Sequence, residues 1–210
     1  MVDWVTISAL ATAGGTLVLA AATFASVRSA NRAARVAEES LLAGIRPLLI
    51  PSRPEDAPEK VGFADGHWVL APGGGGTAEV TPEAIYITMS VRNAGSGIAV
   101  LDSWRLDPKR ALGPADHPPV EEFRRITRDL YIPAGDVGFW QGAFRDPKDD
   151  LFARAREAIE SLHPLTIDLL YGDHQGGQRV ISRFTLVARD EDGWLASVSR
   201  HWNVDRPSPR

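Results

Sequence analysis

The sequence predicts an N-terminal transmembrane helix followed by a mainly-β domain, which we expect to be an antiparallel immunoglobulin-like β-sandwich with one inserted helix. A long run without charged side chains opens the chain, and arginines gather directly after it. From residue 46 onward, short stretches of alternating polar and apolar residues recur between turn signals. An α+β domain, with an antiparallel sheet and one packed helix, is the alternative.

The composition is that of a folded protein with a mildly acidic domain. The 210 residues are 44% hydrophobic and 24% charged, and the formal net charge is -4. Residues 1–45 carry equal numbers of acidic and basic side chains, so the negative excess lies in the remainder. An acidic domain argues against nucleic acid as a partner, because binding phosphates requires a basic face. The chain has no cysteine, which excludes disulfides and thiolate chemistry.

The charge-free run at residues 5–27, "VTISALATAGGTLVLAAATFASV", predicts a transmembrane helix over residues 1–27. Such a helix is about 34 Å long, which exceeds the roughly 30 Å of a bilayer's hydrocarbon core. Trp4 precedes the run, where an indole suits the membrane interface. A cleaved signal peptide fits less well, because Asp3 stands in the N-terminal region and the run is long. A buried soluble helix, the remaining alternative, would need a larger core around it.

Three arginines, Arg28, Arg32 and Arg35, follow the run and predict its orientation. Positive charge close to a span holds its flank in the cytoplasm. We therefore expect a single-pass protein of the cell membrane, with the bilayer as one partner and the bulk of the chain in the cytoplasm.

Small residues at four-residue spacing also occur in the run, where Ala9 pairs with Ala13 and Ala11 with Gly15. Such pairs let two membrane helices approach closely and can drive dimerisation. They are also common in spans that do not pair, so the sequence leaves a homodimer open.

Residues 28–45 contain no proline and predict a stalk helix that ends at Gly44 and Pro47. One narrow apolar stripe runs along it, made of Val27, Ala30, Ala34, Ala37 and Leu41. The stripe favours contact with the chain's own domain or with a second copy, in a homodimer through span and stalk. A helix lying on anionic lipid is a further alternative.

Residues 46–204 are the predicted β-sandwich domain, and residues 205–210 a disordered tail. We expect strands at 46–51, 66–71, 84–93, 98–106, 128–135, 137–144, 165–173, 178–189 and 194–204. The glycine-rich stretch "PGGGG" at 72–76 predicts a flexible loop, and "DEDG" at 190–193 a turn.

One helix is predicted within the domain, over residues 147–162. Asp146 is its expected N-cap, and Pro147 takes the first helical position. Its expected inner face consists of Leu151, Phe152, Ala155, Ile159 and Leu162.

The strands at 84–93 and 98–106 are predicted to form a β-hairpin closed by "AGSG". Asn93, Gly95 and Gly97 suit such a turn, because a positive φ costs little for Asn and Gly. With its charge-poor span, arginine-bearing stalk, opening "RP" strand and "VRNAGSGIAV", the chain resembles a loose group of uncharacterised bacterial single-pass membrane proteins. In that group an N-x-G-x-G-x-A element closes a hairpin of a sandwich domain. The resemblance implies location and fold and no activity.

Reactive residues do not form a recognisable motif. The glycines at 73–76 lack the Gly-Lys-Ser/Thr of a phosphate-binding loop, and no two histidines have metal-ligand spacing. The remaining metal candidate is Asp173, His174 and His201, which the predicted strand ends could bring together. The stretch "EEFRRITR" at 121–128 carries three arginines and suits either a solvated or a membrane-facing surface. No cofactor is predicted.

These observations favour a membrane-anchored, non-catalytic interaction or scaffold protein with a cytosolic β-sandwich and a protein partner. A membrane-tethered enzyme or ligand-binding domain with a site built from loop residues is the first alternative. An exported envelope protein is the second, against which the arginine flank argues.

Overall fold

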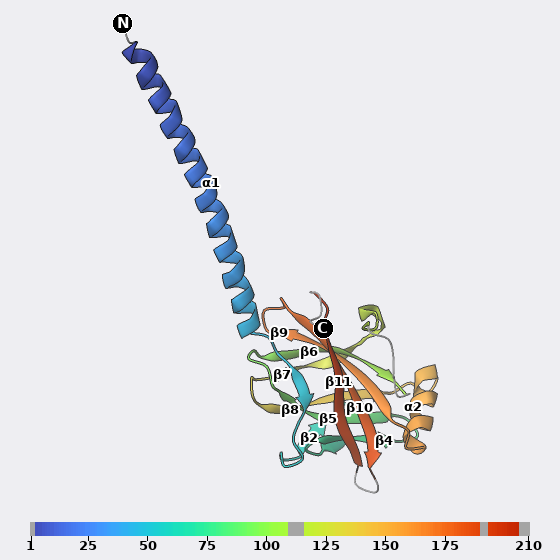
Figure 1. Cartoon of the computed structure of the whole chain (residues 1–210). Helices are drawn as coiled ribbons and strands as arrows, with labels where there is room; N and C mark the ends of the chain where they lie inside the picture. Colours follow the sequence, from blue (N-terminus) through green and yellow to red (C-terminus); the bar gives the residue numbers. More distant parts are fainter. Residues whose placement is uncertain (1–2, 109–115, 190–192, 206–210) are drawn as a thin grey trace. The chain divides into compact units, whose positions relative to one another are not determined.

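The computed structural model describes residues 3–108, 116–189 and 193–205, without the side chains of Trp4 and Thr6. The chain divides into two compact units, Met1–Ala43 and Gly44–Arg210 (Figure 1). The side chain of Trp4 is not described, so its expected interfacial role stays a prediction. The turn residues 190–192 and the predicted tail beyond Asp205 also lie outside the described residues.

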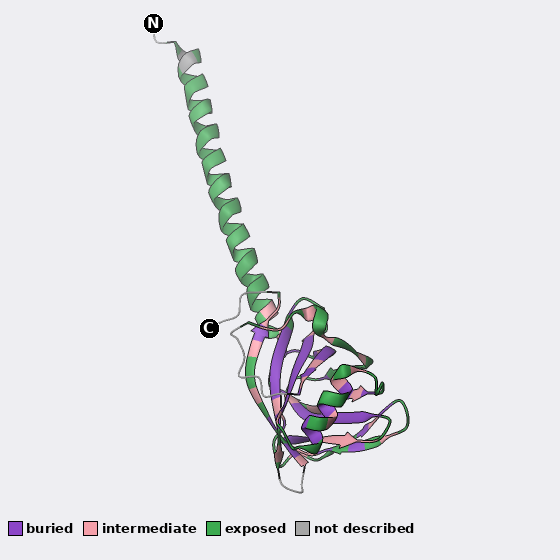
Figure 2. Ribbon diagram, turned by 90° about the vertical axis from the view of Figure 1, so that its right-hand side faces the viewer, coloured by how far each residue is buried: buried purple, intermediate pink, exposed green. Residues whose placement is uncertain are grey.

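The first unit is one helix, α1, from Trp4 to Gly44. Its 41 residues contain no proline, so the predicted span and stalk form one uninterrupted helix. From Ile7 to Gly44 the helix is long and apolar enough to cross a membrane, and its apolar side chains are exposed (Figure 2). Hydroxyl groups within it donate to carbonyl oxygens three or four residues earlier: Ser8 to Val5, Thr12 to Ser8, Thr16 to Thr12 and Thr23 to Leu19.

The second unit is mainly β, as the alternating sequence pattern predicts. Its described residues contain eleven strands, a short 3-10 helix and one α-helix. In chain order these are β1 (Leu49–Pro51), β2 (Glu59–Gly62), β3 (Trp68–Ala71), β4 (Gly75–Val80), β5 (Ile85–Asn93), β6 (Ala99–Asp107), η1 (Val120–Glu122), β7 (Arg124–Ile132), β8 (Val137–Phe144), α2 (Asp150–Glu160), β9 (Leu165–Asp173), β10 (Arg179–Arg189) and β11 (Gly193–Asn203).

Nine strands form one antiparallel sheet, in the order β1-β5-β4-β11-β10-β9-β6-β7 with β8 paired to β5, while β2 and β3 form a separate pair. Residues Ile85 to Met89 of β5 pair with both β4 and β8, which puts these two strands on opposite edges of β5. Val91 and Arg92 pair with both β1 and β8, so β1 lies on the same edge as β4. The two ends of the sheet are therefore β7 and β8, which follow each other in the chain.

The core lies on the inner side of this sheet. Its β5 contribution is Ile85, Ile87, Met89 and Val91, all fully buried as their alternation predicts. These side chains share one cluster with inner residues of the other long strands and with Phe152 of α2. The outer face of β5 is covered too, because Val61 and Phe63 of the β2–β3 region pack on Tyr86.

The inserted helix begins later than predicted. Its N-cap is Asp149, whose Oδ1 accepts a hydrogen bond from the Leu151 N–H at 2.9 Å. Asp146, the expected cap, instead accepts from the Lys148 N–H in the preceding turn. Pro147 has the φ that the second position of a β-turn requires, and the Asp149 N–H closes that turn on the Asp146 carbonyl.

The helix also ends earlier than predicted, so Leu162 does not belong to its inner face. Leu162 is 64% exposed and has a φ of 55°, where the chain turns away from α2. The following residue, His163, donates its N–H to the Ala158 carbonyl at 2.8 Å and closes the helix end.

The stretch "PGGGG" at 72–76 is only partly the predicted loop. Its last two residues, Gly75 and Gly76, begin the strand β4. This strand lies between β11 and β5. A Cβ on Gly75 would collide with the Trp194 carbonyl, and a Cβ on Gly76 with the Thr88 carbonyl. The missing side chains therefore allow the close approach of strands at this point.

The predicted hairpin of residues 84–93 and 98–106 is wrong. In the structure β5 pairs with β1, β4 and β8, whereas β6 pairs with β7 and β9. Gly95 and Gly97 do not have a positive φ, so turn geometry does not explain them. A Cβ on Gly97 would collide with the Ile45 carbonyl, and one on Gly95 with the Arg46 carbonyl. Both glycines make room for the chain that leads into β1.

Asn93 holds this crossing together from a fully buried position. Its Oδ1 accepts from the Leu48 N–H at 3.1 Å and the Gly95 N–H at 3.0 Å. Its Nδ2 donates to the carbonyls of Gly97 at 2.6 Å and Ile132 at 3.0 Å. One amide thus joins β1, the β5–β6 crossing and the end of β7.

Candidate functional site

The two ends of the sheet, β7 and β8, face each other across a seam. A turn at residues 133–136 connects them, with Gly135 at a φ of 77°. Next to this turn the seam is tight, because Ile132 would lie 3.0 Å from a Cβ on Gly138. No ladder joins β7 to β8 among the described residues. Farther from the turn, the seam contains a pocket.

An irregular register in β7 accompanies the pocket. Leu130 pairs with Leu101 of β6, but the next pair joins Arg125 to Ser103. Residues 126–129 therefore have no paired partner on β6. Residues 127–129 of this segment are exposed and Ile126 is half-buried.

The pocket has a volume of about 130 Å³. Its lining is Phe63, Trp104, Arg124, Arg125, Ile126, Thr127, Gln141, Gly142, Ala143 and Arg145. The Trp104 indole stands edge-on to Trp140, with 5.2 Å between ring centroids, and to Phe144, with 5.3 Å. A Cβ on Gly142 would lie 2.7 Å from the Trp140 ring, so this glycine admits the indoles at the pocket wall.

Two of the three pocket arginines are already paired. Arg124 donates from Nη2 to Asp149 Oδ2 at 2.6 Å, and this hydrogen bond together with that from the Leu151 amide lowers the pKa of Asp149. Arg145 donates from Nε to Asp65 Oδ2 at 2.9 Å. Burial opposes ionisation of Asp65, but the hydrogen bonds that it accepts outweigh this effect and lower the pKa of its carboxyl group.

Arg125 and Gln141 are two polar residues of the pocket with unpaired side-chain atoms among the described residues. Among the described residues Arg125 forms no ion pair or side-chain hydrogen bond. Gln141 is 6% exposed, and its buried Oε1 has no hydrogen-bond partner in the described part of the chain. A buried acceptor without a donor is costly, so Gln141 Oε1 is a destabilising feature of the pocket wall.

The size of the pocket restricts what it can hold. Cavities for drug-sized ligands and cofactors have volumes of about 300 to 1,000 Å³. The seam pocket, at about 130 Å³, is smaller than these. It has room for one side chain or a few waters, each of which occupies about 30 Å³ in the liquid.

The residues that the sequence suggested as a metal site have separate roles. Asp173 is buried, and its Oδ1 accepts from the amides of Gln175 and Gly177 in the β9–β10 turn. His174 is exposed in that turn, while His201 of β11 bonds Ser182. No group of three His, Asp or Glu side chains in the described ranges could hold a metal ion.

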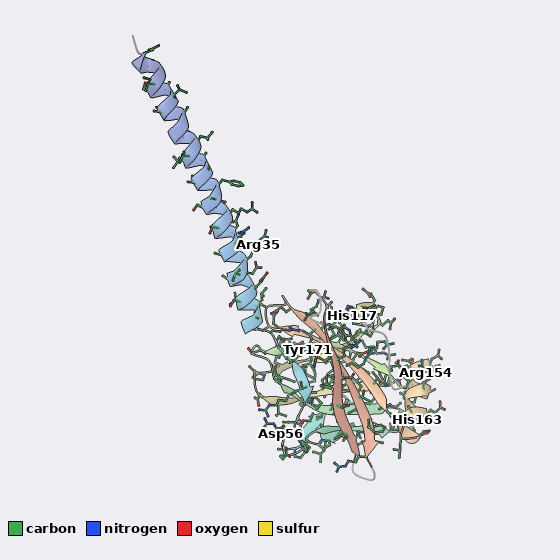
Figure 3. The ribbon with its side chains drawn as sticks, viewed as in Figure 1. Arg35, Asp56, His117, Arg154, His163 and Tyr171 are labelled. Atoms are coloured by element: carbon green, nitrogen blue, oxygen red, sulfur yellow. The ribbon has the colours of Figure 1, made fainter. Side chains whose placement is uncertain are left out.

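His201 belongs to a hydrogen-bonded chain that the sequence did not reveal. Its Nδ1 lies 2.7 Å from Ser182 Oγ, and Ser182 Oγ lies 2.7 Å from the Tyr171 hydroxyl. The Leu49 N–H of β1 donates to that hydroxyl at 3.0 Å. Figure 3 labels Tyr171 within the sheet. Ser182 is fully buried, which makes it a structural link and not an accessible nucleophile.

The candidates on the first unit are all exposed on α1, and their roles remain predictions. They are the flanking arginines Arg28, Arg32 and Arg35, the last of which Figure 3 labels, and the small residues Ala9, Ala11, Ala13 and Gly15. An added Cβ on Gly15 would meet no atom within 4 Å, so this face has room for a second helix.

Of the seam residues, the sequence signalled only the arginines of "EEFRRITR". Gln141 of β8, Trp104 of β6 and Phe63 after β2 are distant in sequence, and tertiary packing brings them together at the pocket. Comparison of the chain with protein-family models, with curated proteins and with solved structures found no match. The function is therefore argued from the residues alone.

Proposed function

We propose that this chain is a membrane-anchored, non-catalytic interaction or scaffold protein whose β domain lies on the cytosolic face and binds another protein. The observation that carries the proposal is α1, a helix with exposed apolar side chains from Ile7 onward and length sufficient for a bilayer. Exposed apolar surface of this extent is costly in water, and a bilayer removes that cost.

The arginines on α1 support the cytosolic orientation. Arg28, Arg32 and Arg35 are exposed on the side of the apolar run that leads to the β domain. The opposite side carries Asp3 and no basic side chain before the run. This asymmetry in lysine and arginine favours a cytoplasmic domain in a single-pass cell-membrane protein.

For the domain we retain the immunoglobulin-like sandwich as the proposed architecture. Its support is one core cluster to which β5, β6, β8, β9 and β10 all contribute. Opposed layers of strands with one apolar interior are the basis of a sandwich.

The two alternatives differ in what would support them. Asp173 and His201 do not support a membrane-tethered enzyme or ligand-binding domain. Asp173 accepts hydrogen bonds within the β9–β10 turn, and His201 is hydrogen-bonded to Ser182. An exported envelope protein would require the domain on the other side of the membrane. A homodimer through span and stalk is compatible with the proposal and uses the small residues of α1.

Protease accessibility of a C-terminal tag tests the proposal. We expect the tag to survive protease added to intact cells and to be lost when the cytosolic face of membrane vesicles is exposed. Loss of the tag in intact cells would overturn the orientation and favour the envelope alternative. A soluble product shortened by about 25 to 30 residues would mean that the apolar run is a cleaved signal peptide.

A further inference from the structure

The three arginines of α1 lie on one face of the helix. Arg28, Arg32 and Arg35 follow one another at steps of four and three residues, which makes their side chains neighbours on an α-helix. Phe24 and Asn31 belong to the same face, because they line one concave surface together with the arginines. The rise of about 1.5 Å per residue places the three arginines within about 10 Å along the helix axis.

This face begins where the apolar run of α1 ends. The run ends at Val27, and a bilayer's headgroup layer extends about 5 to 8 Å beyond its hydrocarbon core. The Cα atoms of Arg28 and Arg32 follow that of Val27 by about 2 and 8 Å along the axis. Side chains lean toward the N-terminus of a helix, which is here the side of the apolar run, so the longer reach of Arg35 (Figure 3) also leads back to the headgroups.

The guanidinium groups of this face are available to a ligand. Arg28, Arg32 and Arg35 are exposed, and within the part of the chain that the structure describes they form no ion pair or side-chain hydrogen bond. The nearest acids in the chain after them, Glu38 and Glu39, come about one helical turn farther from the apolar run. A phosphate oxygen can therefore accept charge-assisted hydrogen bonds from these arginines, in the bidentate geometry that guanidinium favours.

The same concave surface also has an apolar part, which favours a lipid over a soluble anion. Phe24 and Val27 line it on the side of the apolar run and are 70% and 53% exposed. A phospholipid would cover both parts, with its phosphate at the arginines and an acyl chain at the apolar side chains. A choline headgroup adds a cation that arginine repels, so a headgroup with net negative charge fits better.

We propose that the face of Arg28, Arg32 and Arg35 binds an anionic phospholipid of the cytoplasmic leaflet, with an acyl chain against Phe24 and Val27. The three alanines of the apolar stripe lie on the opposite side of α1, so a second copy that pairs there would leave the lipid in place. This inference rests on the proposed function, because it names the headgroup chemistry of the bilayer that anchors the chain.

Tryptophan quenching by brominated lipids tests the preference on this face. The full chain with Trp4→Phe and Phe24→Trp is reconstituted in phosphatidylcholine bilayers, and its remaining tryptophans all belong to the β domain. The indole at position 24 then reports the lipids beside the arginines. We expect brominated phosphatidylglycerol to bind there about fivefold more strongly than brominated phosphatidylcholine, the factor that one basic residue near an anionic surface contributes.

A variant with the same charge but without the shared face is the matched control. Exchanging Arg28 with Ser29 and Arg32 with Ala30, as Arg28→Ser, Ser29→Arg, Arg32→Ala and Ala30→Arg, keeps three arginines after the run and distributes them around the helix. With the same indole at position 24, the preference for phosphatidylglycerol should be lost. An equal preference in both proteins would overturn the proposal, because the number of arginines and not their shared face would explain it.

A soluble competitor distinguishes a lipid from a free phosphate ester. Millimolar glycerol phosphate should leave the preference unchanged, because it has no acyl chain to place against Phe24 and Val27. Loss of the preference in its presence would mean that the face binds the phosphate ester alone, and the lipid would be the wrong ligand.

The same experiment separates this inference from the proposed function. Equal quenching by the two brominated lipids would overturn the headgroup preference and leave the membrane anchor intact, whereas quenching by neither would overturn the anchor itself. The variant with exchanged arginines keeps its positive charge on the same side of the run, so its C-terminal tag should stay protected in intact cells.

Discussion

Tyr171 attaches the first strand of the domain to the sheet from within the core. Its hydroxyl accepts from the Leu49 N–H and contacts Ser182 Oγ, and all three groups are buried. Burial raises the pKa of Tyr171 to about 12, so the hydroxyl keeps its proton at ordinary pH. Removing it leaves two buried polar groups without this partner.

We therefore predict that Tyr171→Phe lowers the free energy of unfolding by about 1 to 3 kcal/mol, the cost of unsatisfied buried groups. Urea unfolding of the full chain in detergent, followed by tryptophan fluorescence, measures the loss. Tyr131→Phe is the matched control, because Tyr131 is 60% exposed. Equal stability of the two variants would contradict the role assigned to the buried hydroxyl.

His201 makes the same chain sensitive to pH. With neutral His201, every group is satisfied when the Tyr171 hydroxyl, which accepts from the Leu49 N–H, donates to Ser182 and the Ser182 hydroxyl donates to Nδ1 of His201. Protonation of Nδ1 would reverse the last of these bonds. Burial, and then the positive charge of Arg46, lowers the pKa of His201.

This lowered pKa predicts a stability change in mildly acidic solution. Below about pH 6.5 the unfolded imidazole binds a proton that the folded one still excludes, so stability falls as the pH falls. His201→Asn keeps an acceptor for Ser182 and has no imidazole. Urea unfolding at pH 7.5 and 5.5 should show a smaller loss for this variant than for the parent. Identical losses would mean that His201 does not couple folding to pH.

At the scale of elements, the sequence predicted strands with clear alternation and missed those without it. The boundaries of β9 match the prediction at residues 165–173, because its apolar run stands between a proline and a glycine-rich turn. β4 was missed, because Gly75 and Gly76 have no side chains to show alternation. The β5–β6 hairpin was wrong because neighbouring strands usually pair, and here the chain crosses to the other half of the sheet.

The same limit explains why the seam could not be predicted as a site. Its pocket lies beside the register shift between Leu130 and Arg125, where β7 and β8 are the ends of the sheet. Both are consequences of pairing between distant segments, for which a single sequence carries no local signal. Only the arginines, which were visible as a cluster, could be singled out beforehand.

The tight approach of strands at β4 gives a prediction for that element. Gly76→Ala would press a methyl group onto the Thr88 carbonyl and toward Leu186, whose Cδ2 would lie 3.3 Å away. We expect a loss of about 1 to 3 kcal/mol in the free energy of unfolding, as for overpacked cores. Gly44→Ala is the control, since a Cβ there meets nothing within 4 Å. A neutral Gly76→Ala would show that β4 can move away from its neighbours.

For the whole molecule, the proposed orientation in the membrane rests on charge that lies outside the β domain. Replacing Arg28, Arg32 and Arg35 by Asn, with Val2→Lys and Asp3→Lys added, moves the positive flank to the other side of the apolar run. Because basic residues near a span are retained in the cytoplasm, we expect protease added to intact cells to remove the C-terminal tag of this variant and not of the parent.

The control for this prediction replaces arginines that lie beyond the window in which charge affects orientation, about 15 to 20 residues from the span. Arg53→Asn, Arg154→Asn and Arg189→Asn remove the same amount of charge from exposed positions of the domain. Their combined variant should keep the tag protected, because loops far from the span do not set its direction. If both variants expose the tag, charge far from the span also affects the orientation, and the effect cannot be assigned to the flank alone. If neither does, the apolar run is oriented by something other than Arg28, Arg32 and Arg35.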